Sequence, residues 1–152
     1  MATLRELAAT RPWMDLDRVG IVGHSAGGAA AVRAVLDYPD VFRAAVAGSG
    51  VHDLRRYLAY WAEKYEGLPD EVDYAEASNI ERAHEIDRPL LVLHGELDDN
   101  VHPSHTLALV DAVLRTGREV ELVLLPGQNH DCATHPEYRR RSWEFLVRHL
   151  MD

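Results

Sequence analysis

One short stretch, residues 17–28, constrains the fold of this chain more than any other. Residues 19–22 are mostly β-branched and apolar, as expected of a buried parallel strand. The pattern G-x-S-x-G follows at residues 23–27, and residues 29–36 are helix formers. The stretch therefore predicts a strand, a sharp turn that carries Ser25, and a helix.

The predicted turn has the chemistry of a nucleophile site. A serine between a strand and a helix is held in a strained conformation, with its hydroxyl clear of the sheet. We expect glycine at positions 23 and 27 because a Cβ atom there would collide with the strand or the helix. The Ala26 N–H, at the start of the helix, is placed to bind an oxyanion. A chance match in a turn rich in glycine and alanine is the alternative interpretation.

The rest of the chain alternates between strand and helix patterns. We expect strands at residues 42–48, 89–94 and 119–125, and helices at residues 3–12, 103–116 and 136–150. Thr3 is the expected N-cap of the first helix, and Trp143, Phe145, Leu146 and Leu150 are the expected apolar positions of the last. This βαβ order predicts an α/β domain with a parallel sheet and right-handed crossovers.

Residues 51–87 form a polar segment that is too long for a plain loop. Aromatic and apolar residues recur in it at helical spacing, and Ser78 is expected to cap a short helix over residues 79–86. Two interpretations remain open. The segment is either a partial cap over the site, or a surface excursion whose aromatic residues only pack against the core.

Composition narrows the possible partners. The 152 residues carry a formal net charge of −9, whereas nucleic acids and anionic membranes bind basic surfaces, so we expect neither as a partner. With 47% hydrophobic and 27% charged residues, the chain is expected to form a single domain over residues 1–152. Its one cysteine excludes an intrachain disulfide, and the lack of a signal peptide or apolar span favours the cytoplasm.

A serine hydroxyl needs a base, usually an imidazole oriented by a carboxylate. In parallel α/β sheets such groups lie just beyond the strand C-termini. The sequence His94-Gly95-Glu96-Leu97-Asp98-Asp99-Asn100-Val101 follows the third expected strand, and Pro126-Gly127-Gln128-Asn129-His130-Asp131 follows the fourth. A carboxylate and a histidine therefore follow the serine in the order that this fold uses.

Three linked motifs of the chain resemble those of the prolyl oligopeptidase family, including its members similar to dipeptidyl peptidase IV. They are G-x-S-x-G-G at residues 23–28, H-G-x-x-D-D-N-V at residues 94–101 and P-G-x-x-H at residues 126–130. Residues 65–69 and 143–145 also resemble that family. The resemblance implies a truncated, minimal α/β-hydrolase fold of about four parallel strands flanked by helices, corresponding to the C-terminal half of the family's catalytic domain.

The resemblance also assigns roles. It implies that Ser25 is the nucleophile, His130 the base and Asp98 the acid, with Asp99 as the fallback for Asp98. His135 is a less favoured alternative base, because it is expected at a helix N-terminus. His24, Tyr57, Trp61 and Tyr65 are candidate substrate-binding residues.

Other reactive residues are interpreted as structural. His102 and His105 lie three residues apart and would need a third ligand such as Asp99 to hold a metal, so neither a metal nor another cofactor is expected. Cys132 is two residues from His130, but the elbow carries serine, and we expect a packed thiol rather than a catalytic one.

The resemblance begins partway through the family's catalytic domain. The elbow strand is then a bare sheet edge, which favours a homodimer or higher oligomer. The loop that supplies the second oxyanion donor is also missing, and losing one such donor costs about 3 kcal/mol.

The leading expectation is a serine hydrolase that cleaves small carboxylic esters through an acyl-enzyme, because amides require fuller oxyanion stabilisation than esters. The alternatives are a prolyl-oligopeptidase-like peptidase and a catalytically idle remnant of such a domain.

Overall fold

The computed structural model describes residues 2–151. Its strands are β1 (Val19–His24), β2 (Phe42–Gly48), β3 (Leu90–Gly95) and β4 (Glu121–Leu125). Its α-helices are α1 (Ala2–Ala9), α2 (Ala26–Asp37), α3 (Ala59–Glu66), α4 (Ser104–Arg115) and α5 (Pro136–Leu150). Short 3₁₀ helices are η1 (Leu54–Arg56), η2 (Ala83–Glu85) and η3 (His130–Thr134).

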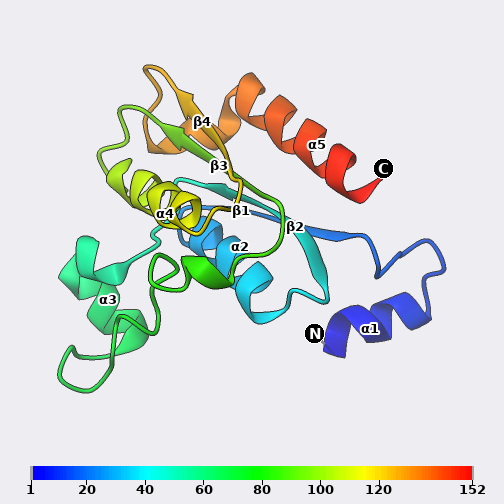
Figure 1. The fold of residues 1–152 in the computed structure, drawn as a ribbon, viewed down its shortest axis with the longest axis horizontal. Helices are drawn as coiled ribbons and strands as arrows, with labels where there is room; N and C mark the ends of the chain where they lie inside the picture. The colour runs from blue at the N-terminus through cyan, green and yellow to red at the C-terminus, as the bar shows by residue number, and fades with distance from the viewer. Residues whose placement is uncertain (1, 152) are drawn as a thin grey trace.

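The four strands form one parallel sheet in the order β1-β2-β3-β4, so the predicted α/β class and strand number are confirmed (Figure 1). His24 and Gly48, the last residues of β1 and β2, lie in register with Leu93, two residues before the end of β3. This register brings the segments that follow the strands to the same edge of the sheet.

Alternate residues of the central strands enter two separate cores. Ala45 and Ala47 of β2 pack with α2, α4 and η2, whereas Ala44 and Val46 pack with α5 and η3. Figure 1 shows α5 on one side of the sheet and α2 with α4 on the other. Because both faces of β2 and β3 are covered, these strands read as continuous apolar runs.

Three local expectations were wrong. Thr3 lies inside α1 rather than at its N-cap, and Trp143 of α5 is 68% exposed rather than packed. Tyr138 and Ser142 take the buried side of α5 together with Phe145 and Leu146. The Ser78 hydroxyl accepts from the N–H groups of residues 80 and 81, as expected of a cap. The capped residues 79–86, however, form turns and the short η2 instead of an α-helix.

The elbow strand β1 lies at one edge of the sheet, and its Val22 side chain is 51% exposed. No residue of α1 is buried within the described part of the chain, so this helix contributes little apolar burial to the domain. Among residues 2–151, the structure has no helix of sufficient length and apolarity to cross a lipid bilayer.

Candidate active site

Ser25 connects β1 to α2 in a left-handed backbone conformation, with φ 58° and ψ −125°. Gly23 permits this turn, since a Cβ atom there would lie 1.9 Å from the carbonyl oxygen of Gly27. Gly28 is equally constrained, because its Cβ would lie 2.4 Å from the Gly48 carbonyl oxygen. The expectation for Gly27 was wrong: a Cβ atom there would meet open space.

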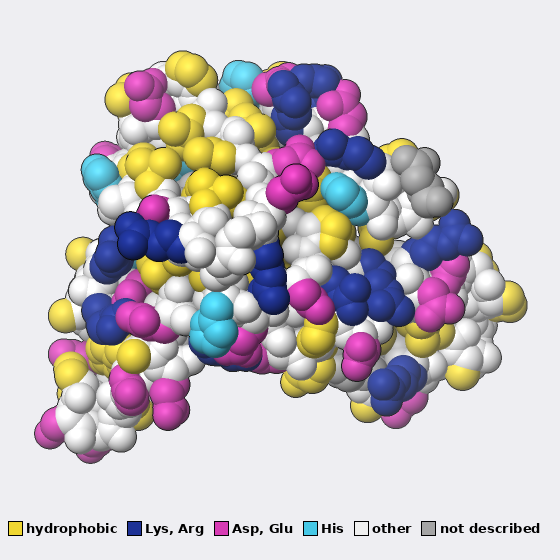
Figure 2. Space-filling model, viewed as in Figure 1, with side chains coloured by type: hydrophobic (Ala, Val, Ile, Leu, Met, Phe, Trp, Pro, Cys, Tyr) yellow, Lys and Arg dark blue, Asp and Glu magenta, His cyan; other side chains and the backbone are white. Residues whose placement is uncertain are grey.

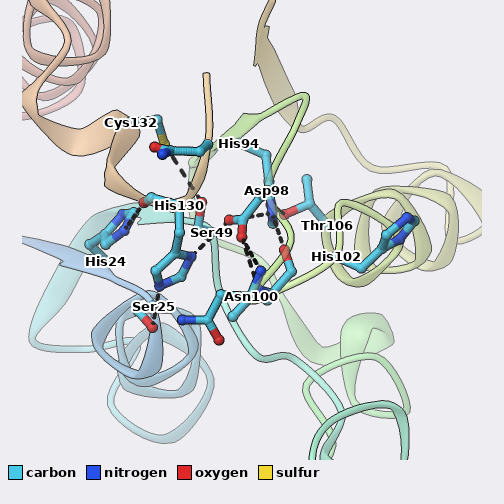
Figure 3. Close-up of polar contacts among 12 residues, drawn as sticks. His24, Ser25, Ser49, His94, Asp98, Asn100, His102, Thr106, His130 and Cys132 are labelled. Atoms are coloured by element: carbon cyan, nitrogen blue, oxygen red, sulfur yellow. Dashed lines mark hydrogen bonds and ion pairs between the residues drawn. The ribbon is translucent and has the colours of Figure 1, made fainter. Parts of the chain in front are cut away.

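Ser25, His130 and Asp98 form one continuous chain of hydrogen bonds (Figure 3). Ser25 Oγ lies 3.0 Å from His130 Nε2, and His130 Nδ1 lies 2.8 Å from Asp98 Oδ2. With Nδ1–H donating to the carboxylate, Nε2 is left to accept the serine proton. The three groups come from the ends of β1, β3 and β4, which are far apart in the sequence.

The Asp98 carboxylate is almost fully buried and has several hydrogen-bond donors. Its Oδ1 accepts from the N–H groups of Asn100 and Val101, at 3.1 and 2.9 Å. Burial by itself would raise the pKa of Asp98, but the hydrogen bonds from His130 and Val101 outweigh burial and hold that pKa below its usual value. Asp98 therefore stays ionised and can orient the His130 ring.

His94 packs beside Asp98 and fixes the backbone of the loop that carries it. Its Nε2 lies 2.8 Å from the Val101 carbonyl oxygen and 3.2 Å from Asp98 Oδ2, while Nδ1 accepts from the Thr106 hydroxyl at 2.8 Å. Burial lowers the pKa of His94, which favours the neutral ring that this pattern of donor and acceptor requires. The sequence does not reveal these partners of His94, because Val101 and Thr106 come close to it only in the folded chain.

Backbone hydrogen bonds connect the loop after β3 to the end of β4 and the loop after it. Leu97 N–H donates to the Gln128 carbonyl at 2.8 Å, and Glu96 N–H donates to the Leu125 carbonyl at 3.0 Å. Gly95 allows this approach, since a Cβ there would lie 2.3 Å from the Asn129 carbonyl oxygen. The two loops that carry Asp98 and His130 therefore form one unit.

His24 contacts the loop that carries His130. Its Nε2 lies 2.8 Å from the carbonyl oxygen of His130, so it holds the backbone of that loop. A role for His24 in substrate binding stays a prediction. Burial, followed by the charge of His130, lowers the pKa of His24. Ala26 is the first residue of α2, and N–H groups in a first helical turn have no partner within the helix, which leaves the Ala26 N–H available to an oxyanion.

The three aromatic candidates lie together on one side of the site. The Tyr57 and Trp61 ring centroids are 6.2 Å apart, and those of Trp61 and Tyr65 are 4.5 Å apart. Tyr57 also donates its hydroxyl to Asn100 Oδ1 at 2.7 Å, which ties η1 and α3 to the loop that carries Asp98. Trp61 and Tyr65 line a cavity that Ala26 also lines, which favours the partial-cap interpretation of this segment.

The less favoured candidates have structural contacts. His135 Nδ1 accepts from the Glu137 N–H and caps α5, and His105 Nε2 bonds the Arg56 carbonyl. Cys132 is buried 3.6 Å from the Ser49 hydroxyl, and burial raises the pKa of its thiol. Asp99 is exposed. Within residues 2–151, no three His, Cys, Asp or Glu side chains are grouped as metal ligands would be.

The whole chain, residues 1–152, matches the model of the prolyl oligopeptidase family. It is 36% identical to dipeptidyl peptidase 8 of Homo sapiens over 154 residues, which covers 98% of this chain and 17% of that protein. It is 31% identical to a probable dipeptidyl-aminopeptidase B of Arthroderma gypseum over 145 residues, or 90% of this chain and 16% of the relative. The chain thus spans about a sixth of these relatives.

Solved structures show the same likeness in three dimensions. Dipeptidyl peptidase 4 of Porphyromonas gingivalis superposes with a TM-score of 0.87 at 26% identity, over 98% of this chain and 22% of that one. A putative dipeptidyl aminopeptidase IV from Bacteroides ovatus gives a TM-score of 0.88 at 26% identity over the same shares. The predicted resemblance is confirmed, and with the model match over its full length the chain belongs to the prolyl oligopeptidase family.

Proposed function

We propose that this chain is a serine peptidase domain that cleaves peptide bonds through an acyl-enzyme. The observation that carries the proposal is the unbroken hydrogen-bond chain from Ser25 through His130 to the buried Asp98. The names of the relatives support a peptidase better than the esterase that the sequence favoured.

In the proposed first step, Ser25 Oγ attacks the substrate carbonyl carbon while His130 Nε2 takes the hydroxyl proton. Asp98 stabilises the imidazolium that forms, and the Ala26 N–H binds the oxygen that gains negative charge. The tetrahedral intermediate then breaks its C–N bond, and His130 gives its proton to the leaving amine. In the second half, water takes the place of the serine hydroxyl, and the acid and free Ser25 are released.

Ester hydrolysis is a secondary reaction of the same proposal. Ser25 is only half-buried, and an ester leaving group departs without the protonation that an amine needs. A domain that cleaves anilides is therefore expected to cleave short activated esters as well.

The test is a side-by-side assay with a prolyl dipeptide p-nitroanilide and p-nitrophenyl butyrate. We expect both to be hydrolysed, and Ser25→Ala to abolish both reactions while leaving the circular dichroism spectrum unchanged. A fluorophosphonate probe should add one label at Ser25. Activity of Ser25→Ala within a few fold of the unmodified protein would refute the assignment, and ester cleavage alone would restore the esterase interpretation.

A further inference from the structure

Two serines have an unusual backbone conformation. Within residues 2–151, the residues other than glycine with a positive φ are Ser25, at 58°, and Ser49, at 43°. Side chains rarely adopt this conformation, and where a fold imposes it the residue often belongs to a functional site. Ser25 is the proposed nucleophile. Ser49 directly follows β2 and is fully buried, so its hydroxyl must find hydrogen-bond partners inside the protein.

The peptide unit between Gly48 and Ser49 connects the nucleophile to the strand that leads to the acid. Its carbonyl oxygen accepts from the Ser25 N–H at 2.8 Å, and its N–H donates to the Leu93 carbonyl oxygen at 2.9 Å. Leu93 belongs to β3, which ends three residues before Asp98. One peptide unit therefore holds the elbow against the strand that precedes the acid.

The Ser49 hydroxyl lies between a buried thiol and the carboxylate of the triad (Figure 3). Its Oγ is 3.6 Å from Cys132 Sγ. Burial raises the pKa of Asp98, but hydrogen bonds from His130, from Val101 and then from Ser49 lower it. Burial also raises the pKa of Cys132, so the thiol keeps its proton. Because an ionised carboxylate only accepts, the hydroxyl of Ser49 donates to Asp98 and accepts from the thiol.

No arginine or lysine compensates the charge of Asp98. In the part of the chain that the structure describes, its ion pairs are with His94 and His130. Burial lowers the pKa of His94, which favours the neutral form of that ring. Figure 2 shows Lys and Arg side chains on the outer surface of the molecule. Neutral donors therefore hold most of this buried charge, and the loss of one of them should be measurable.

We propose that Ser49 is a positioning residue of the active site, whose hydroxyl donates to the Asp98 carboxylate and thereby sets how that carboxylate holds His130. Without the hydroxyl, Asp98 has one donor fewer and becomes a stronger acceptor for the His130 Nδ1–H. The protonated ring is then held more tightly, so the base is lost at a higher pH. The inference rests on the proposed peptidase function and adds a residue to its machinery.

The first test is the pH profile of kcat/KM for Ser49→Ala with a prolyl dipeptide p-nitroanilide. We expect the acid limb to move up by about half a pH unit. We expect kcat to fall about fivefold, the scale of one hydrogen bond, with KM within twofold because substrate contacts are unchanged. An acid limb that stays in place would overturn the proposal.

Ser142→Ala is the matched control. It removes another buried hydroxyl, which donates to the Tyr138 carbonyl oxygen at 2.8 Å within α5. Its acid limb should match that of the unmodified protein, and an equal shift in this variant would refute a specific role for Ser49. The other titratable groups near the Asp98–His130 pair are unchanged in both variants, so they cannot cause a difference between them. These groups are His24, Tyr57, His94, Asp131 and Cys132.

Ser49→Gly separates the hydroxyl from the backbone. Glycine adopts a φ of 43° without strain, so this variant retains the peptide unit that joins Ser25 to β3 and loses only the side chain. We expect the same upward shift of the acid limb as in Ser49→Ala. A shift in the alanine variant alone would trace the effect to backbone strain and would refute the role of the hydroxyl.

Proton NMR separates this inference from catalysis. The Nδ1–H resonance of His130, identified by its loss in His130→Gln, should move downfield in both Ser49 variants and stay in place in Ser142→Ala. This shift reports the strength of the hydrogen bond to Asp98 and needs no turnover. An unchanged resonance in the Ser49 variants would refute the positioning role. The expected shift in a protein that hydrolyses nothing would refute only the peptidase function.

Discussion

The two sides of the proposed active site are built differently. On one side, the loops after β3 and β4 are bonded to each other, and Asp98 is only 2% exposed. On the other, residues 51–89 contain only short helices and turns, and Tyr60 is 67% exposed. The first arrangement suits groups that must be aligned for proton transfer, whereas the second suits a surface that contacts the substrate and tolerates change.

The two ends of the less ordered segment meet at a narrow neck, formed by His52 and Asn79. The N–H of Asn79 donates to the His52 carbonyl at 2.9 Å, and the Asn79 amide donates to the Ala29 carbonyl at 2.9 Å. His52 is almost fully buried beside them. The segment is therefore closed at its base, where its two ends are bonded to each other and Asn79 is bonded to α2.

The largest expected effect is a loss of activity when the alignment of His130 by Asp98 is removed. Asp98→Asn should lower kcat by about 10³- to 10⁴-fold, because an amide does not hold His130 in the required tautomer. Asp99→Asn is the matched control and should stay within twofold of the unmodified protein, since Asp99 is exposed and outside the hydrogen-bond chain. Steady-state kinetics on a p-nitroanilide measures both, and a larger loss in Asp99→Asn would reverse the two roles.

The second prediction concerns the close contact between the loops that follow β3 and β4. Gly95→Val should lower the free energy of unfolding by about 3 kcal/mol or more, because its Cβ would enter the backbone of Gln128 and Asn129. Gly27→Ala at the elbow is the control, since a Cβ there meets open space. Urea denaturation compares them, and equal midpoints would show that the loops can separate without loss.

His52, at the neck, should make the free energy of unfolding depend on pH. Burial, with the charges of His105 and His94, lowers the pKa of His52 to about 3, against an ordinary value of 6.5. The unfolded chain therefore binds a proton that the folded chain excludes as pH falls below 6.5, so stability declines between pH 6.5 and pH 3. One such histidine contributes a slope of up to about 1.4 kcal/mol per pH unit.

Urea denaturation at pH 7 and pH 5 measures this slope. His52→Gln should flatten it, whereas His84→Gln should not, because His84 is exposed. An unchanged slope in His52→Gln would mean that the buried His94 and His105 and the half-buried His24 account for the acid sensitivity. In these three, too, burial lowers the pKa.

The smallest effect concerns the edge of the sheet next to the elbow. Pairing of β1 with a second copy stays a prediction, based on its edge position and the exposed Val22. Val22→Lys should shift the sedimentation coefficient from dimer to monomer and change the unfolding free energy little. A protein that is monomeric before the substitution would contradict the prediction.

Sequence by itself determined the parallel sheet, the elbow and the pairing of Asp98 and His130 with Ser25. These features depend on local patterns: apolar runs mark the buried strands, and the functional residues directly follow strand ends, which a parallel sheet brings together. Position relative to the strands selected the two loops, and the resemblance to the prolyl oligopeptidase family selected Asp98 and His130 within them.

Tertiary structure alone decided what surrounds those residues. His94 acquires its partners from Val101 and Thr106, His24 turns to the His130 backbone, and Arg33 is directed at the loop before Asn79. Trp143 lies outside and Tyr138 inside, although both are aromatic residues of one helix. Such contacts depend on the packing of segments distant in the sequence, which periodicity and turn chemistry do not encode.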